Sequence, residues 1–313
     1  MSIRLDVNSI IKSGRQRRQI LYAPSNQLKK LQKGATLSNL DVIAFDLEDG
    51  VNPSQKDIAR KTLHEFLRNK PSIKPELAVR INALDSQDSM KDLNEIFLDP
   101  IIQSQVKCII MPKVEDVHEI DFLERWLRFN NMKNTKLLAM IETPLGLTKV
   151  NSIASRSPLV EGLIFGAEDF KSAAGISKIP PPHTLDFARS SIVTAARAFG
   201  KQAIDMVSLD FRHPEIIKAE ALESKAIGMT GRQVIHPMQV EIVNSAFSPT
   251  QKEQEKYIQT IKTFVKTWSS GKGVFENESG TMVELPHVTD AIRQLYMAGK
   301  SIPEIQQIID FAL

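Results

Sequence analysis

The sequence predicts an α/β protein, a single (β/α)8 TIM barrel with a C-terminal helical extension. Short apolar runs of strand length alternate with helical patterns eight times, which predicts a parallel sheet. These eight units occupy about 240 residues, a span in which such a sheet closes into a barrel. The structural alternative is a doubly wound open sheet. A doubly wound sheet typically carries a glycine-rich phosphate-binding loop after its first strand. Neither G-x-G-x-x-G nor G-x-x-x-x-G-K-S/T occurs in this sequence, which favours the barrel.

The predicted strands are short runs rich in aliphatic residues, and helical patterns fall between them. The strands are Gln19–Ala23, Val42–Glu48, Leu77–Asn82, Cys108–Pro112, Lys136–Glu142, Gly162–Gly166, Gln202–Val207 and a broken eighth, Ala226–Thr230 continuing to Val234–His236. The clearest helices are Gln27–Lys33, Ser54–Leu67, Glu115–Phe129 and Thr184–Phe199.

The character of the sequence changes after Pro249, where the barrel pattern ends. A helix is predicted from Gln251 to Trp268, then a flexible hinge at Ser269–Gly273, and two more helical stretches at Val288–Met297 and Pro303–Ala312. We therefore expect three segments: a basic N-terminal segment (1–17), a catalytic barrel (18–249) and a C-terminal extension or lid (250–313).

The composition is that of an ordinary globular protein, with 42% apolar and 25% charged residues. The net charge of +3 is spread along the chain and aromatic residues make up only 6%, so we expect no nucleic-acid partner. No apolar run approaches the roughly 20 residues of a membrane span, so no membrane partner is expected either. The single cysteine, Cys108, excludes an intrachain disulfide and favours a reducing compartment.

The first twenty residues are basic, with a single acid, Asp6. This segment has two interpretations: a mitochondrial presequence, or a basic N-terminal helix that leads into the first strand. The expected location is therefore the cytoplasm or the mitochondrial matrix. The basic residues are Arg4, Lys12, Arg15, Arg17 and Arg18.

Charged residues fall at the C-terminal ends of the predicted strands, where barrel enzymes place their chemistry. Two carboxylates from different strands, Glu142 and Asp169, suit a hard cation such as Mg²⁺, which takes one or two protein carboxylates. The alternative is that the strand-end acids only form ion pairs with Arg80 or a lysine. One arginine cannot pair all of them, because Asp46 and Glu48 lie there as well.

Other reaction classes find little support. Neither G-x-S-x-G nor H-E-x-x-H occurs, and Cys108 lies in an apolar run, as a core residue would. His236 alone among the histidines follows a predicted strand. The lysines after the first strand, Lys29, Lys30 and Lys33, form either a solvated face or a phosphate site at a helix start.

Eight segments in order resemble the citrate lyase β-subunit-like family within the HpcH/HpaI aldolases. The extended tail is most similar to citramalyl-CoA and malyl-CoA lyases. The resemblance implies a magnesium-bound barrel, commonly a homotrimer, that cleaves or forms 3-hydroxyacyl-CoA thioesters. The segments are Leu21–Asn26, Phe45–Gly50, Val79–Asn82, Met111–Glu115, Ile141–Thr143, Phe165–Asp169, Ala203–Asp205 and Gln233–Pro237.

The resemblance also implies roles for individual residues. Glu142 and Asp169 would bind magnesium, and Arg80 would contact substrate oxygens. Tyr22, Lys29 and Lys33 would hold coenzyme A near its phosphates, with Ile235 and His236 lining the same cleft. A tail acid would reach a neighbouring subunit's active site, and here Glu284 stands where aspartate is usual.

The expected function is magnesium-dependent cleavage of a 3-hydroxyacyl-CoA thioester to acetyl-CoA and a 2-oxo acid such as pyruvate or glyoxylate. Glu284 is the candidate for proton transfer, and its alternative is an exposed tail acid. Two other functions stay open. One is a catalytically impaired homologue that binds acyl-CoA and regulates, which the departure at Glu284 motivates. The other is a citrate lyase component that needs a carrier protein.

Overall fold

The computed structural model describes residues 5–11, 15–69, 71–177, 181, 183–276, 280 and 282–312. Arg4 and Lys12 of the basic N-terminal segment lie outside these residues. The chain forms two compact units. One comprises residues 17–244, and the other combines residues 1–16 with residues 245–313.

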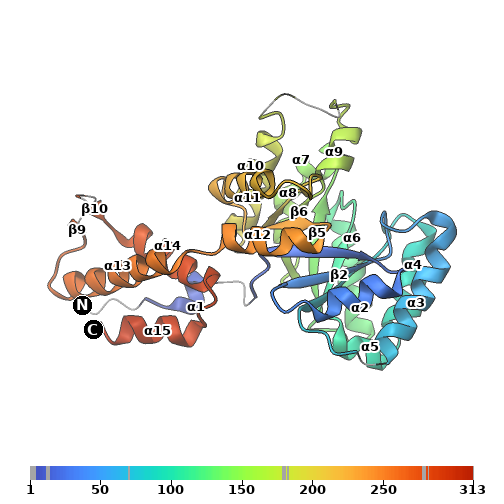
Figure 1. Cartoon of the computed structure of the whole chain (residues 1–313), viewed down its shortest axis with the longest axis horizontal. Coiled ribbons are helices and arrows are strands. Elements are labelled where there is room, and N and C mark those ends of the chain that lie inside the picture. The colour runs from blue at the N-terminus through green and yellow to red at the C-terminus, as the bar shows by residue number, and fades with distance from the viewer. Residues whose placement is uncertain are drawn as a thin grey trace. The chain divides into compact units, whose positions relative to one another are not determined.

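Residues 17–244 contain a closed barrel of eight parallel strands in chain order, with helices around it, which confirms the predicted fold (Figure 1). The strands are β1 (Gln19–Pro24), β2 (Val42–Asp46), β3 (Glu76–Arg80), β4 (Cys108–Met111), β5 (Lys136–Ile141), β6 (Val160–Phe165), β7 (Gln202–Asp205) and β8 (Gly231–Val234). The barrel closes where β1 pairs with β8, with Leu21 opposite Val234.

The helices of this part of the chain follow the strands. They are α2 (Leu28–Thr36), η1 (Pro53–Gln55), α3 (Lys56–Arg68), α4 (Gln87–Phe97), α5 (Pro100–Gln105), α6 (Val117–Phe129), α7 (Pro144–Thr148), α8 (Val150–Ser155), α9 (Ala167–Ala173), α10 (Asp186–Ala198), α11 (Pro214–Ala226) and α12 (Pro237–Phe247). Across the described residues, no helix is long and apolar enough to cross a membrane.

The prediction for the eighth strand was wrong in its first half. Ala226 is the last residue of α11, and the strand begins at Gly231. Gly228 has a left-handed φ of 99°, and the N–H of Met229 donates to the carbonyl of Ser224. This is the Schellman arrangement that ends a helix, so the apolar residues around Gly228 belong to a helix end and not to a strand.

The barrel interior is filled by alternate residues of the strands, as the two-residue period requires. Ala44, Ala78 and Met140 share this core, so the next inward positions along their strands belong to Asp46, Arg80 and Glu142. Cys108 is fully buried in the same core, as predicted. The interior members are Ile20, Val42, Ala44, Ala78, Cys108, Ile110, Leu138, Met140, Ile164 and Ile204.

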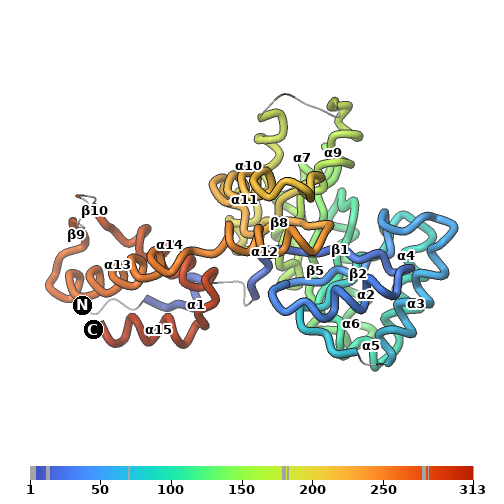
Figure 2. Tube along the Cα trace, in the orientation of Figure 1, coloured from blue at the N-terminus to red at the C-terminus, as the bar shows by residue number. Residues whose placement is uncertain are grey.

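The second unit is helical and has a hydrophobic core of its own. Leu5, Val7 and Ile11 from the N-terminal segment are buried in that core beside residues of the C-terminal helices. Figure 2 shows α1 lying against α14 and α15. The elements are α1 (Val7–Ile10), α13 (Gln251–Ser269), β9 (Phe275–Glu276), β10 (Met282–Val283), α14 (Leu285–Met297) and α15 (Ile302–Asp310).

Candidate active site

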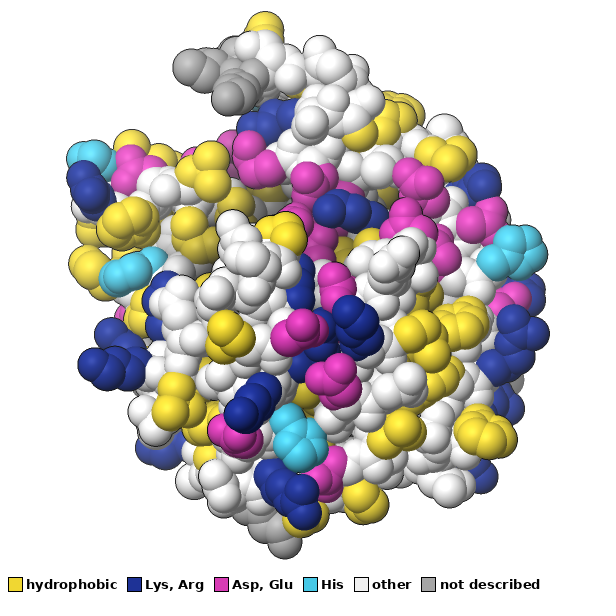
Figure 3. Space-filling model, turned by 90° about the vertical axis from the view of Figure 1, so that its right-hand side faces the viewer, with side chains coloured by type: hydrophobic (Ala, Val, Ile, Leu, Met, Phe, Trp, Pro, Cys, Tyr) yellow, Lys and Arg dark blue, Asp and Glu magenta, His cyan; other side chains and the backbone are white. Residues whose placement is uncertain are grey.

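Four charged side chains meet at the C-terminal end of the barrel. Asp46 and Arg80 are the last residues of β2 and β3, Glu142 directly follows β5, and Asp169 lies in the first turn of α9 after β6. Neighbouring parallel strands end at the same rim, so alternation along each strand suffices to bring these groups together. On one face of the molecule, acidic side chains gather around a hollow (Figure 3).

Arg80 is held by Asp46 and Glu48. Its Nε and Nη2 donate to the two oxygens of Asp46, both at 2.7 Å, and its Nη1 lies 3.0 Å from Glu48 Oε2. The Tyr22 ring covers the guanidinium, with 4.7 Å between the ring centroid and Cζ. Burial would raise the pKa of Asp46, but Arg80 and two backbone N–H groups lower it below its usual value. For Asp46 and Glu48, therefore, the ion-pair interpretation is right.

The loop after β2 is shaped around the Asp46 carboxylate. The backbone N–H groups of Glu48 and Gly50 donate to Asp46 Oδ1 and Oδ2, both at 2.9 Å. A Cβ at Gly50 would overlap Asp46 Oδ2, so glycine is required there for the loop to approach so closely. Asp46 is thus fully bonded by the protein itself.

Lys113 follows β4 and connects the pair to the next carboxylate. Its φ of 52° is left-handed, which is uncommon for a residue with a Cβ. Its backbone N–H donates to Glu142 Oε2 at 2.7 Å, and its ammonium donates to Glu48 Oε1 at 2.9 Å. Burial would lower the pKa of Lys113, but Glu48 and the neighbouring acids raise it, so the ammonium stays charged.

Glu142 lies in a different environment from Asp46. Glu142 is only 2% exposed, and within the described residues its carboxylate accepts one hydrogen bond, from the backbone N–H of Lys113. Burial raises its pKa to about 8, and the charges of Glu48 and Asp169 act in the same direction. Gly166 leaves room for this carboxylate, since a Cβ there would overlap it. Glu142 is a buried acid with too few donors for its charge.

The residues present fit a divalent cation. Two cations, Arg80 and Lys113, face the four carboxylates Asp46, Glu48, Glu142 and Asp169. A cation at Glu142 and Asp169 would balance the remaining negative charge. No cluster of three or more possible metal ligands was found in the part of the chain that the structure describes. That is compatible with Mg²⁺, which completes its octahedron with water and substrate.

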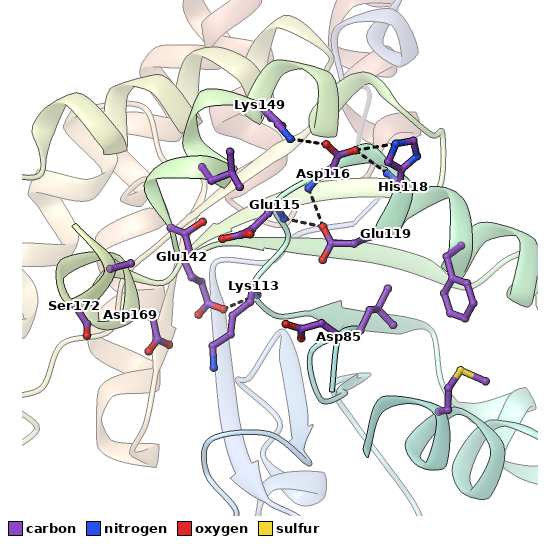
Figure 4. A pocket seen from close by; sticks show the side chains of 16 residues that line it. Asp85, Lys113, Glu115, Asp116, His118, Glu119, Glu142, Lys149, Asp169 and Ser172 are labelled. Atoms are coloured by element: carbon purple, nitrogen blue, oxygen red, sulfur yellow. Dashed lines mark hydrogen bonds and ion pairs between the residues drawn. The ribbon is translucent and has the colours of Figure 1, made fainter. Parts of the chain in front are cut away.

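A cavity of about 870 Å³ opens beside these groups, within the size range of small-molecule sites. Figure 4 shows Glu142, Asp169 and Lys113 along one wall and Asp85, Glu119 and Asp116 along the other. The loops after β3, β4, β5 and β6 supply the lining, so the cavity lies at the same rim as the charged cluster.

The residues expected to bind coenzyme A lie in separate environments. Tyr22 is packed against Arg80 inside the barrel mouth, whereas Lys29 and Lys33 are exposed on α2. Ile235 is 43% exposed just beyond β8, and the ring of His236 stacks on Phe211 with 5.1 Å between centroids. The structure therefore brings Tyr22 to the charged cluster, whereas Lys29, Lys33 and Ile235 are exposed and His236 is half-buried.

Glu284 belongs to the helical unit. It is exposed directly before α14, and its backbone N–H donates to His287 Nδ1 at 3.2 Å. Its carboxylate is accessible, and its role stays a prediction.

Lys113 had no predicted role, although it lies in the segment Met111–Glu115. The available signal was a lysine directly after a buried strand, the same kind of position that singled out Arg80 and Glu142. The left-handed backbone that aims its N–H at Glu142 has no mark in the sequence, because lysine rarely adopts that conformation.

Together, the fold and the site define a barrel protein with an acidic site at the C-terminal ends of its strands that fits a divalent cation. Residues 18–237 match the family described as HpcH/HpaI aldolase/citrate lyase. The chain belongs to this family.

Relatives with known names match over most of their length. The chain is 31% identical to the mitochondrial citramalyl-CoA lyase of Homo sapiens, a match that covers 90% of this chain and 85% of that one. It is 34% identical to the citrate lyase subunit beta of Haemophilus influenzae, covering 92% and 99%. The CitE protein of Mycobacterium tuberculosis, solved in complex with magnesium, acetoacetate and coenzyme A, matches with a TM-score of 0.72 and 28% identity, covering 92% and 99%.

Proposed function

We propose that this protein is a magnesium-dependent carbon–carbon lyase that cleaves a 3-hydroxyacyl-CoA thioester of the citramalyl-CoA or malyl-CoA type. The observation that carries the proposal is the pair Glu142 and Asp169, two acids that have no salt-bridge partner among the described residues, next to the side chains of Arg80 and Lys113. The family and the magnesium and coenzyme A found with a structural relative support it.

In this proposal Glu142 and Asp169 hold the metal ion, and Arg80 faces the substrate oxygens. When bound, magnesium would supply Lewis-acid stabilisation of oxygen charge. A base removes the hydroxyl proton, and the bond between the hydroxyl carbon and the thioester α-carbon breaks. The electron pair moves into the acetyl-CoA enolate, which then takes up a proton. The products are acetyl-CoA and a 2-oxo acid, pyruvate or glyoxylate.

Glu284 is the proposed proton-transfer group, and it would act on a neighbouring subunit within a homotrimer. Its exposed carboxylate is compatible with that role. Tyr22, Lys29, Lys33, Ile235 and His236 are the proposed contacts of coenzyme A. The two exposed lysines would meet its phosphates as point charges. The proposed compartment is a reducing one, the cytoplasm or the mitochondrial matrix, in line with the single cysteine, Cys108.

A second candidate is a citrate lyase β-type component that acts on a thioester carried by another protein. The 34% identity to a citrate lyase subunit beta favours it. Free coenzyme A thioesters separate the two, because a component that depends on a carrier protein would not turn them over.

The decisive experiment incubates the purified chain with a panel of free acyl-CoA thioesters and Mg²⁺ and follows the products by mass spectrometry. We expect acetyl-CoA together with pyruvate or glyoxylate, and loss of both on chelation of the metal. Turnover only of a carrier-bound thioester would favour the second candidate. Tight acyl-CoA binding without any product would support a regulatory homologue instead.

A further inference from the structure

Two cations lie at the charged cluster, and they differ in how much they can offer a ligand. The Arg80 side chain is 11% exposed, three of its N–H groups are committed to Asp46 and Glu48, and Tyr22 covers it. The Lys113 side chain is 39% exposed and lines the cavity. The more accessible cation of the site is therefore Lys113.

The donors of Lys113 point to the same conclusion. Glu48 accepts one ammonium N–H at 2.9 Å, and Asp49 lies at 3.6 Å, beyond hydrogen-bond length. Within the described residues the ammonium thus has N–H capacity left for a ligand. Glu48 also anchors the side chain, since its other oxygen faces Arg80 at 3.0 Å. The Glu48 carboxylate thus pairs with both cations, of which Lys113 lines the cavity.

The charges around the Lys113 ammonium indicate what kind of ligand it could bind. A divalent cation at Glu142 and Asp169 would offset most of the negative charge that Arg80 and Lys113 leave, with Asp49 the remaining acid beside Lys113. A small anion could then approach, and the accessible Lys113 ammonium, which interacts electrostatically with Asp169, is a group that can donate to it. In Figure 4, Lys113 projects into the cavity on the same side as Asp169.

We propose that Lys113 is a further substrate-binding residue of this site, whose ammonium binds the carboxylate of the 2-oxo acid formed or used in the reaction. This inference rests on the proposed function for the class of ligand. The backbone of the same residue positions Glu142 through its N–H, so one residue after β4 connects the metal ligand to the substrate anion.

The test measures two affinities that we expect the Lys113→Met substitution to affect differently. The first is the Kd of Mg²⁺ for the protein alone, and the second is the Kd of pyruvate at saturating Mg²⁺, both by calorimetry. In Lys113→Met the loss of a positive charge beside Glu142 and Asp169 should leave Mg²⁺ binding unchanged or tighter. Pyruvate binding should weaken roughly 10- to 100-fold, the range for a lost charge-assisted hydrogen bond.

Two further variants separate the ammonium from the backbone. Lys113→Gly adopts the left-handed conformation readily and so keeps the N–H bond to Glu142, and it should reproduce the loss of pyruvate affinity. Lys136→Met is the matched control. Lys136 pairs with Glu161 at 3.4 Å with 31% of its side chain exposed, but it starts β5 at the opposite end of the barrel. It should change neither affinity.

The outcomes are distinct from those of the proposed function. Pyruvate affinity within twofold of wild type in Lys113→Met would overturn the inference, as would equal weakening of Mg²⁺ and pyruvate in both Lys113 variants. Wild-type protein that fails to bind pyruvate at all would also overturn it. Pyruvate binding that depends on Lys113 in a protein without lyase activity would support the residue's role and reject the proposed reaction.

Discussion

Asp46 and Glu142 lie on the same rim of the barrel, at the C-terminal ends of β2 and β5. They differ in how many hydrogen bonds their carboxylates accept. Asp46 accepts two bonds from Arg80 and two from backbone N–H groups, and its pKa is lowered. Glu142 accepts one hydrogen bond from the part of the chain that the structure describes, and burial raises its pKa to about 8. Both acids are almost fully buried. The difference shows which carboxylate is part of the scaffold and which is available to bind a ligand.

The comparison extends to the glycines that make room for each acid. Gly50 lets the β2 loop reach Asp46, and Gly166 lets the end of β6 pass close to Glu142. The first contact completes a set of hydrogen bonds. The second places the Glu142 carboxylate close to α9, the helix that carries Asp169. The negative charge of Asp169 then acts on Glu142 and raises its pKa. The same small residue therefore serves stability on one side of the rim and ligand binding on the other.

The largest expected effect comes from removing the available acids. Glu142→Ala and Asp169→Ala should each abolish measurable turnover, with kcat lowered by roughly three orders of magnitude or more. The reason is that a two-carboxylate Mg²⁺ site loses half its charge. The fold should survive, since neither acid takes part in the Arg80 pairing. Steady-state rates with circular dichroism as the folding control test this. Near-normal activity of either variant with magnesium present would reject the assignment.

Much of this contrast was within reach of the sequence. The sequence placed Asp46, Arg80 and Glu142 at the C-terminal ends of predicted strands, because a short apolar run and its end are local information. Which acids Arg80 would pair with was not predictable, because the answer depends on how the loop from Leu47 to Gly50 folds back. The acids were found correctly as a set, and their division into paired and unpaired needed the structure.

Two other features lay beyond local patterns for different reasons. The burial of Leu5, Val7 and Ile11 among the C-terminal helices joins segments more than 240 residues apart, and no periodicity reports such a contact. The eighth strand was predicted to begin at Ala226, which is the last residue of α11. The apolar run there is equally compatible with a helix end and a strand. In both cases tertiary packing decides, and Gly228 marks the helix end only once its φ is known.

A smaller effect should follow from filling the two glycine spaces. Gly166→Ala should displace the Glu142 carboxylate and lower kcat by about 10²-fold, the cost of misplacing a group by about an ångström. Gly50→Ala should instead lower the free energy of unfolding by about 1–3 kcal/mol, because it strains the loop around Asp46. Rates and denaturant unfolding of both variants give the comparison. Equal losses of activity and stability in the two would remove the distinction between the acids.

The last expected effect is a dependence of stability on pH. The folded protein keeps the Glu142 proton up to about pH 8, whereas the unfolded chain releases it near its ordinary pKa of about 4.5. The folded state therefore binds more protons between these values. With a chelator present, this group's contribution to stability is complete below pH 4.5 and is lost as the pH rises through 8. The slope is about 1.4 kcal/mol per pH unit within that window.

Magnesium should reverse this trend, because it binds the carboxylate form and competes with the proton. The increase in Tm caused by Mg²⁺ should be larger at pH 8.5 than at pH 6.0, and Glu142→Gln should lose both the pH slope and most of the Mg²⁺ response. Asp46→Asn is the matched control. The pKa of Asp46 is already lowered, so its stabilising contribution is lost only in acid, below the window, and the variant should keep the wild-type slope between pH 5 and 8. Differential scanning calorimetry with EDTA or MgCl₂ measures both. A Glu142→Gln variant with an unchanged slope would show that Glu142 is ionised in the folded protein, and the contrast with Asp46 would then have to rest on hydrogen bonding alone.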